Sequence, residues 1–187
     1  HPADPWIVGH CYSPPLLPNG IGQCESLDAV CADRPVVLYP TDYHALWANS
    51  VALAIAGVKA GTPDPPLGEI VRHADGRPVG MLLEFGAMDL VQRHLPPISS
   101  ATFARGLTEA MRCLSMEGIV WAQDASVALE EFEAYIEGAR SGAATCRINN
   151  AFRADPLLWV TQRPTFAAAR DALALDPAAS AWVAART

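Results

Sequence analysis

The sequence predicts an α/β fold on three grounds. From residue 99 onward the pattern runs helix, strand, helix, strand, helix, which is the order of a parallel βαβ unit. Near the middle of the chain, Asp75-Gly76 separates two strand-like runs, which is a strong hairpin signal. The 187 residues are 51% hydrophobic and only 18% charged, so the chain has enough apolar material for one domain with a core.

The first half of the chain is predicted to contain four strands and one long helix. Thr41-Asp42 can cap a helix over residues 43–56, which Gly57 ends. The first strand is a short apolar run, suited to burial on both faces. The four strands are expected at residues 6–9, 36–39, 69–72 and 78–83.

The second half is predicted to alternate helices and strands. A helix that begins at Ser99 or Ser100 carries an apolar stripe and ends at Gly118. A buried strand then ends in the polar pair Gln123-Asp124, and Ser126 can cap the acidic-fronted helix that follows. In order, the elements are a helix over 99–118, a strand over 119–122, a helix over 129–140, a strand over 145–152 and a helix toward residue 175.

Composition and motifs exclude several classes of function. The formal net charge of −7 excludes a nucleic-acid binder that relies on a basic surface. Apolar runs are far shorter than the ~18 residues of a membrane-spanning helix, so no membrane partner is expected. The phosphate-binding P-loop, G-x-G-x-x-G, G-x-S-x-G and H-E-x-x-H are all absent. The five histidines are scattered at positions 1, 10, 44, 73 and 94, so they cannot build a self-contained metal site.

Cysteine usage predicts a reducing compartment. The chain has five cysteines, an odd number, and no C-x-x-C pair. We therefore expect reduced, mostly buried thiols in a cytoplasmic protein.

Three stretches, together with shorter matches between them, carry a family resemblance. The first is P-W-I-V-G-H at residues 5–10, the second is D-x-H-x-x-x-x-N at residues 42–49, and the third is D-G-R-P-x-G at residues 75–80, with Leu83-Glu84 after it. The shorter matches lie at 33–36, 62–66, 68–72, 118–119 and 123–125. In this order, over about residues 5–155, they resemble the amidohydrolase-3 group of metal-dependent hydrolases, relatives of N-substituted formamide deformylase.

The resemblance implies more fold than this chain contains. The family has a (β/α)8 barrel with an α+β insertion, and its metal ligands begin with an H-x-H pair on the first barrel strand. This sequence has no H-x-H. The resemblance therefore implies a partial (β/α)8 barrel, about strands 2–4, that lacks the metal ligands. Its parts would be a barrel strand and Pro/Gly-rich loop in 1–35, an inserted α+β subdomain in 36–98 and a βαβ portion of the barrel in 99–187.

The chain departs from the family pattern at two places. Cys11-Tyr12 stands where the family usually has Gly-Trp, and Tyr43 stands where it usually has Gly. These departures are expected to reshape the pocket without changing the fold.

Five polar residues are predicted to line the substrate pocket: Asp42, His44, Asn49, Glu84 and Asp124. His44, held by Asp42, is expected to donate a hydrogen bond or to stabilise charge. On one helix, His44 and Asn49 would diverge by roughly 140°, so one of them must lie in the cap turn. Asp124 lies at the carboxyl end of a predicted strand, and this is the end of a barrel strand at which catalytic residues lie. Each residue also has a structural alternative: a helix cap for the two aspartates, a surface position for His44, backbone hydrogen bonds for Asn49, and a favourable place at a helix start for Glu84.

Three functional hypotheses follow. The first is the central segment of a cytoplasmic amidohydrolase that cleaves an amide or formamide C–N bond in a small molecule. In the complete enzyme a divalent metal, with zinc as the expected ion, activates water. This chain alone is expected to hold no cofactor, to be inactive, and to self-associate or lack partner segments. The second hypothesis is a stand-alone, non-catalytic α/β binding or assembly module. The third is a metal site that two copies share through His10, His44 and cysteines.

Overall fold

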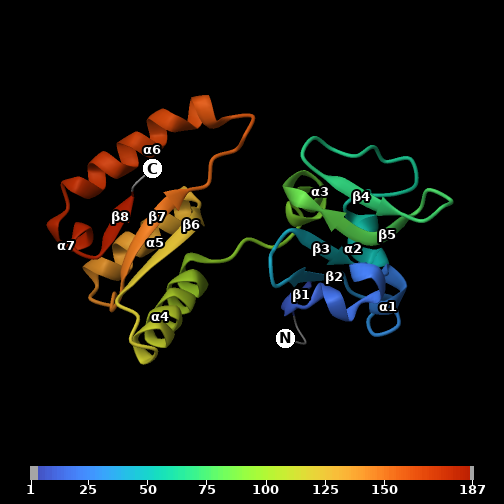
Figure 1. Cartoon of the computed structure of the whole chain (residues 1–187), viewed down its shortest axis with the longest axis horizontal. Helices are drawn as coiled ribbons and strands as arrows, with labels where there is room; N and C mark the ends of the chain where they lie inside the picture. Colours follow the sequence, from blue (N-terminus) through green and yellow to red (C-terminus); the bar gives the residue numbers. More distant parts are fainter. Residues whose placement is uncertain (1–3, 186–187) are drawn as a thin grey trace. The chain divides into compact units, whose positions relative to one another are not determined.

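The computed structural model describes residues 4–185, which fall into two units, within residues 1–97 and 98–187 (Figure 1). The first unit contains a five-stranded mixed sheet, and the second contains a three-stranded sheet. The mixed α/β class predicted from sequence is therefore confirmed. Among the described residues, no helix is both long and apolar enough to cross a membrane.

The sheet of the first unit has the strand order β1-β2-β3-β5-β4. Strands β1 and β2 pair in parallel, whereas the remaining neighbours pair antiparallel. The β4–β5 hairpin confirms the prediction from Asp75-Gly76. The strands are β1 (Ile7–Tyr12), β2 (Val36–Pro40), β3 (Ala45–Ala48), β4 (Glu69–Arg72) and β5 (Pro78–Leu83).

Two apolar layers cover this sheet. On one face, side chains such as Val37 and Leu46 pack against the helices α2 (Ser50–Ile55) and α3 (Glu84–Gln92). On the other face, Trp47 and Met81 pack against the segment between β1 and β2. That segment contains the short helices η1 (Pro14–Leu16), η2 (Pro18–Gly20) and α1 (Cys24–Asp28).

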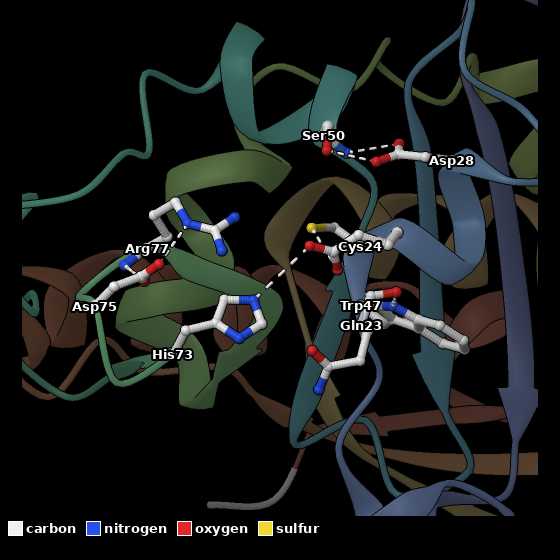
Figure 2. A network of polar contacts seen from close by, with 9 residues as sticks. Gln23, Cys24, Asp28, Trp47, Ser50, His73, Asp75 and Arg77 are labelled. Atoms are coloured by element: carbon white, nitrogen blue, oxygen red, sulfur yellow. Dashed lines mark hydrogen bonds and ion pairs between the residues drawn. The ribbon is translucent and has the colours of Figure 1, made fainter.

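A polar network ties α1 to the rest of the first unit (Figure 2). The indole Nε1 of Trp47 donates to the backbone oxygen of Gln23 at 3.0 Å. The Ser50 hydroxyl donates to Asp28 at 2.5 Å, so the start of α2 is held against the end of α1. Near the start of α1, a carboxylate oxygen of Glu25 lies 3.8 Å from Nε2 of His73, the residue that follows β4.

Two predictions about the first unit are wrong. The helix predicted over 43–56 is a strand, β3, in its first part, and α2 begins only at Ser50. The cause is tertiary: the apolar run of β3 fills the place between β2 and β5, and Asn49 rather than Asp42 caps the helix. Strand β1 is not buried on both faces, because it lies at the edge of the sheet in this unit and leaves Val8 43% exposed.

The second unit confirms the predicted parallel βαβ order. Its sheet has the order β6-β7-β8, with all pairs parallel. The strands are β6 (Trp121–Val127), β7 (Arg147–Phe152) and β8 (Val183–Ala185). The helices are α4 (Ser100–Met116), α5 (Leu129–Arg140), α6 (Trp159–Ala174) and α7 (Pro177–Ser180).

The helices of the second unit bury one face of its sheet. Phe152 of β7 packs edge-on against Phe132 of α5 and stacks on Phe166 of α6, both at 4.9 Å between ring centroids. Most of β6 is exposed, including Trp121 at 57%. The buried strand predicted over 119–122 is therefore wrong: residues 119 and 120 precede β6, and the strand continues past Asp124 to residue 127.

Candidate functional site

A cavity of about 430 Å³ in the first unit brings together three of the five predicted residues. Asp42, His44 and Glu84 line it, together with Tyr12 from β1 and Met81 from β5. The turn between β2 and β3 supplies Asp42 and His44, and the junction of β5 with α3 supplies Glu84. The cavity therefore lies where strands β1, β2 and β5 end.

The side chains of His44 and Glu84 are hydrogen-bonded to each other in this cavity. Nδ1 of His44 lies 3.2 Å from both carboxylate oxygens of Glu84. The backbone N–H of Glu84 donates to the carbonyl of His44 at 3.0 Å, so backbone and side chains join the same two residues. A carboxylate on Nδ1 fixes the imidazole tautomer and leaves Nε2 as the proton acceptor. Such a pair can act as a general base.

Asp42 holds the turn that presents His44. One of its carboxylate oxygens accepts a hydrogen bond from the backbone N–H of His44 at 3.1 Å. This is an Asx turn, in which a short acidic side chain replaces a backbone acceptor. Asp42 thus positions His44, as the sequence suggested, although no helix begins there.

The backbone around the cavity is strained. Tyr43 and Glu84 adopt left-handed conformations, with φ of 59° and 61°, and Cys11 of β1 does the same at 66°. For a residue with a Cβ atom this region costs roughly 1–2 kcal/mol, whereas glycine adopts it readily. Positions 11 and 43 are the ones at which the resembling family usually has glycine, so the left-handed backbone gives a physical reason for that pattern.

Tyr12 places a phenol on the cavity wall. Its hydroxyl lies 3.7 Å from the sulfur of Met81. Burial, together with the nearby Asp42 carboxylate, raises the pKa of Tyr12 to about 12. Tyr12 therefore stays protonated at neutral pH and can donate a hydrogen bond.

Asn49 lies away from the cavity and is fully buried. Its side-chain oxygen accepts from the N–H groups of Val36 and Ala52, both at 3.0 Å. Its side-chain nitrogen donates to the carbonyls of Cys31 at 3.0 Å and Arg34 at 2.9 Å. These four bonds use the full capacity of the carboxamide, so the structure gives Asn49 the backbone-bonding role.

Asp124 belongs to the second unit and faces its helices. Its carboxylate accepts a hydrogen bond from the hydroxyl of Tyr135 on α5 at 2.8 Å. Burial, together with this carboxylate, raises the pKa of Tyr135. Ala128, and neither Asp124 nor Ser126, occupies the N-cap position of α5.

Asn150 is a polar residue that sequence reasoning missed. It pairs in register with Asp124 across β6 and β7 and is fully buried. Within the part of the chain that the structure describes, neither polar atom of its side chain has a hydrogen-bond partner. The signal for it was the Asn-Asn pair inside a predicted strand, where polar residues are disfavoured.

The metal implied by the family resemblance does not fit these residues. Among residues 4–185, no group of three or more His, Cys, Asp or Glu side chains is placed to hold a metal ion. His44 and Glu84 offer one nitrogen and one carboxylate, whereas a zinc centre takes at least three protein ligands. No catalytic step is therefore assigned to a metal held by this chain.

A larger cavity of about 690 Å³ lies in the second unit between α4 and α5. Apolar side chains such as Phe103 and Leu107 line one side, and glutamates of α5 lie along the other. None of the five predicted residues lines it.

Comparison with known proteins gives consistent matches. The family model described as "Amidohydrolase family" matches residues 1–184. YtcJ of Bacillus subtilis (strain 168), whose name describes an amidohydrolase, is 31% identical over 149 residues, which is 74% of this chain and 28% of YtcJ. The N-substituted formamide deformylase of Arthrobacter pascens is 46% identical over 61 residues, 33% of this chain and 11% of that enzyme.

One solved structure extends the similarity to the fold. The crystal structure of an uncharacterized metal-dependent hydrolase from Pyrococcus horikoshii OT3 superposes with a TM-score of 0.53 at 15% identity. The match covers 87% of this chain and 30% of that structure. The chain therefore spans less than a third of the length of each of these proteins.

Proposed function

Because this chain belongs to the amidohydrolase family, we propose that it is part of an enzyme that hydrolyses the C–N bond of a small amide or formamide. The observation that carries the proposal is the His44–Glu84 pair, which lies in a cavity of about 430 Å³. The name of the Arthrobacter pascens relative, a formamide deformylase, supports this class of substrate.

The side chains of the cavity suit the proton transfers of amide hydrolysis. Glu84 holds Nδ1 of His44, so Nε2 can take a proton from an attacking water and return it to the leaving nitrogen. The protonated hydroxyl of Tyr12 can donate to the carbonyl oxygen of the substrate. In this proposal a divalent metal, with zinc as the expected ion, is bound by residues outside this chain.

We further propose that the second unit is a portion of a (β/α)8 barrel completed by other segments, and that residues 36–98 form an inserted subdomain. Three parallel strands with helices on one face support this proposal. Consecutive apolar residues at 157–160, each more than half exposed, also fit a fold whose remaining surface is supplied elsewhere. A stand-alone binding module would be expected to bury such a run.

Five free cysteines support a reducing, cytoplasmic location for the proposed enzyme. The proposed partners are a small-molecule amide and either further segments of the enzyme or a second copy of the chain.

A chimera tests the proposed activity. The segment of the Arthrobacter pascens deformylase that corresponds to residues 4–185 is replaced by this chain, and zinc-dependent hydrolysis of an N-substituted formamide is measured. We expect turnover, and we expect His44→Gln and Glu84→Gln each to lower kcat by about 100-fold or more. His94→Gln and Glu117→Gln, two exposed changes outside the cavity, serve as matched controls and should leave kcat unchanged.

Two results would count against the proposal. A chimera that folds and binds zinc without hydrolysing formamides would disprove the proposed reaction. Full activity in His44→Gln and Glu84→Gln would show that the pair takes no part in proton transfer.

A further inference from the structure

The cavity between α4 and α5 reaches from the surface of the second unit down to its sheet. Met111 of α4, Ile148 of β7 and Val183 of β8 all line it, and all three are buried. Its innermost part is therefore apolar. Its volume of about 690 Å³ falls within the roughly 300–1,000 Å³ of pockets that hold small molecules.

Helix α4 leaves most of its apolar stripe uncovered beside this cavity. The stripe consists of Phe103, Leu107, Met111 and Leu114, and within α4 only Met111 is buried. Phe103 and Leu107 are half-buried and line the cavity. An amphipathic helix normally buries such a stripe against its own fold, so the cavity offers apolar surface that a ligand can cover.

Helix α5 forms the opposite wall with small side chains. A Cβ atom on Gly138 would lie 3.3 Å from a methyl carbon of Leu107, so the two helices are in contact at that point. One turn earlier on α5, Ala134 lines the cavity with a single methyl group. A large side chain at position 134 would therefore fill space that is open in this chain.

Negative charge prevails along the rim of the cavity. Four glutamates of α5 line it, whereas Arg153 is the only basic residue among residues 4–185 that does so. Arg153 follows the end of β7, and its backbone N–H donates to the carbonyl of Val127, two residues before α5 begins. Further along α5, the charged side chains of the rim are carboxylates.

Glu133 and Glu137 are the carboxylates placed to receive a cation. They lie about one helical turn apart and are both exposed, and neither makes a side-chain hydrogen bond or salt bridge within the described part of the chain. Arg140 lies near both, but its guanidinium is paired with Asp176 at 2.7 Å. Two like charges without a counter-charge of their own attract a cation, by a modest amount at exposed positions.

We propose that this cavity binds a small cationic amphiphile. The alkyl chain of the ligand covers the stripe of α4 at Phe103 and Leu107. Its ammonium group lies beside Glu133 and Glu137. One molecule of this kind matches the apolar wall and the charged rim together, whereas an anionic amphiphile matches only the first. The site lies in the second unit and does not depend on the proposed hydrolysis at the His44–Glu84 pair of the first unit.

Titration of the 187-residue chain with three ions tests this. Octyltrimethylammonium, hexyltrimethylammonium and octyl sulfate are added below the concentrations at which they form micelles, while the NMR signals of Leu107 and Met111 are followed. We expect octyltrimethylammonium to shift these signals and to bind roughly three- to tenfold more tightly than octyl sulfate. The hexyl compound should bind roughly tenfold more weakly than the octyl compound, because each buried CH₂ contributes about fourfold.

Three variants sharpen the test. Ala134→Phe fills the cavity and should abolish the shifts with every ion. Glu133→Gln combined with Glu137→Gln leaves the apolar wall intact and should bring octyltrimethylammonium and octyl sulfate to nearly equal affinity. Because both glutamates are exposed, this double variant keeps its fold and decides the question even if Ala134→Phe does not fold. Glu117→Gln, an exposed change outside the cavity, is the matched control and should change nothing.

Equal affinity of the wild type for octyltrimethylammonium and octyl sulfate would overturn the inference. An unchanged preference in the double variant would do the same. Shifts confined to Trp159 and its neighbours would place the binding on the exposed apolar run at 157–160, and would also overturn it.

Discussion

Asn49 stabilises the first unit with four hydrogen bonds from one side chain. The bonds reach the N–H of Val36, which is the first residue of β2, two carbonyls before it, and the first turn of α2. Because the side chain is fully buried, water cannot replace a lost bond.

We therefore expect Asn49→Ala to lower the free energy of unfolding of the first unit by about 3–5 kcal/mol. Urea denaturation followed by circular dichroism measures this. Asn49→Ser keeps an acceptor for the N–H of Ala52 and should lose less stability. A change below about 1 kcal/mol in Asn49→Ala would show that the four bonds are dispensable.

At single residues, sequence reasoning succeeded where the neighbours in the chain decide the outcome. The D-x-H spacing placed Asp42 beside the backbone of His44, and the structure shows that contact. The partners of Asn49 lie 13 to 18 residues upstream, except for Ala52, so no local pattern could reveal them. Likewise, the pairing of His44 with Glu84 joins residues 40 apart and depends on β3 lying beside β5.

Among the elements, β5 depends on a glycine that no other residue could replace. Gly80 has φ of 107°, and a Cβ atom there would lie 2.7 Å from the carbonyl oxygen of Ala48 and 2.8 Å from the backbone nitrogen of Cys24. Both obstacles are backbone atoms and cannot rotate away.

We expect Gly80→Ala to destabilise the first unit by about 3 kcal/mol or more, measured as a shift in the urea midpoint. Gly76, in the hairpin turn, has φ of 85° but open space around it. Gly76→Ala should therefore cost only about 1 kcal/mol, from backbone strain alone. Equal losses in the two variants would show that the contacts with Ala48 and Cys24 do not matter.

The loop before β4 should make stability depend on pH. The carboxylate of Asp64 accepts hydrogen bonds from the N–H of Ile70 and from Arg72, which together lower the pKa of Asp64 below its ordinary value of 3.8. Because the pKa of Asp64 is lower in the folded state, its ionised carboxylate stabilises the fold. This stabilisation is fully present above pH 3.8 and is lost as the pH falls through the folded-state pKa.

Acidification below pH 3.8 should therefore destabilise the first unit less in Asp64→Asn than in the wild type. Thermal unfolding at a series of pH values measures this difference. Asp33→Asn provides the matched change, at an exposed carboxylate that accepts a hydrogen bond from the thiol of Cys31. The same pH slope in the wild type and Asp64→Asn would contradict the assignment.

Helices α4 and α5 and strand β7 were predicted well because each follows one local pattern, whereas β6 begins and ends later than predicted. The helix over 129–140 was predicted with its observed bounds, since acidic residues at its start and a glycine after its end mark both termini. The β3 run was misassigned because an apolar stretch of four residues fits a helix or a strand equally well, and only its place between β2 and β5 decides.

At the scale of the whole molecule, the two units differ in how completely they are covered. Both faces of the first sheet carry apolar layers. In the second unit, helices cover one face, and much of β6 remains exposed.

Separate expression of residues 4–97 and 98–185 should show this difference. We expect the first piece to unfold cooperatively as a monomer, and the second to bind an apolar dye and to self-associate in size-exclusion chromatography. A monomeric second piece without dye binding would contradict the proposed barrel portion and favour a stand-alone module.

The interior position of β2 in its sheet has a consequence for the dynamics of the first unit. This strand pairs with β1 on one side and β3 on the other, and four of its five residues are buried. Its amide hydrogens can exchange with solvent only when the unit opens as a whole, whereas those of β4, at the sheet edge, exchange through local fraying. The exchange rate of Val37 in deuterated water therefore reports the global stability of the scaffold on which the cavity is built.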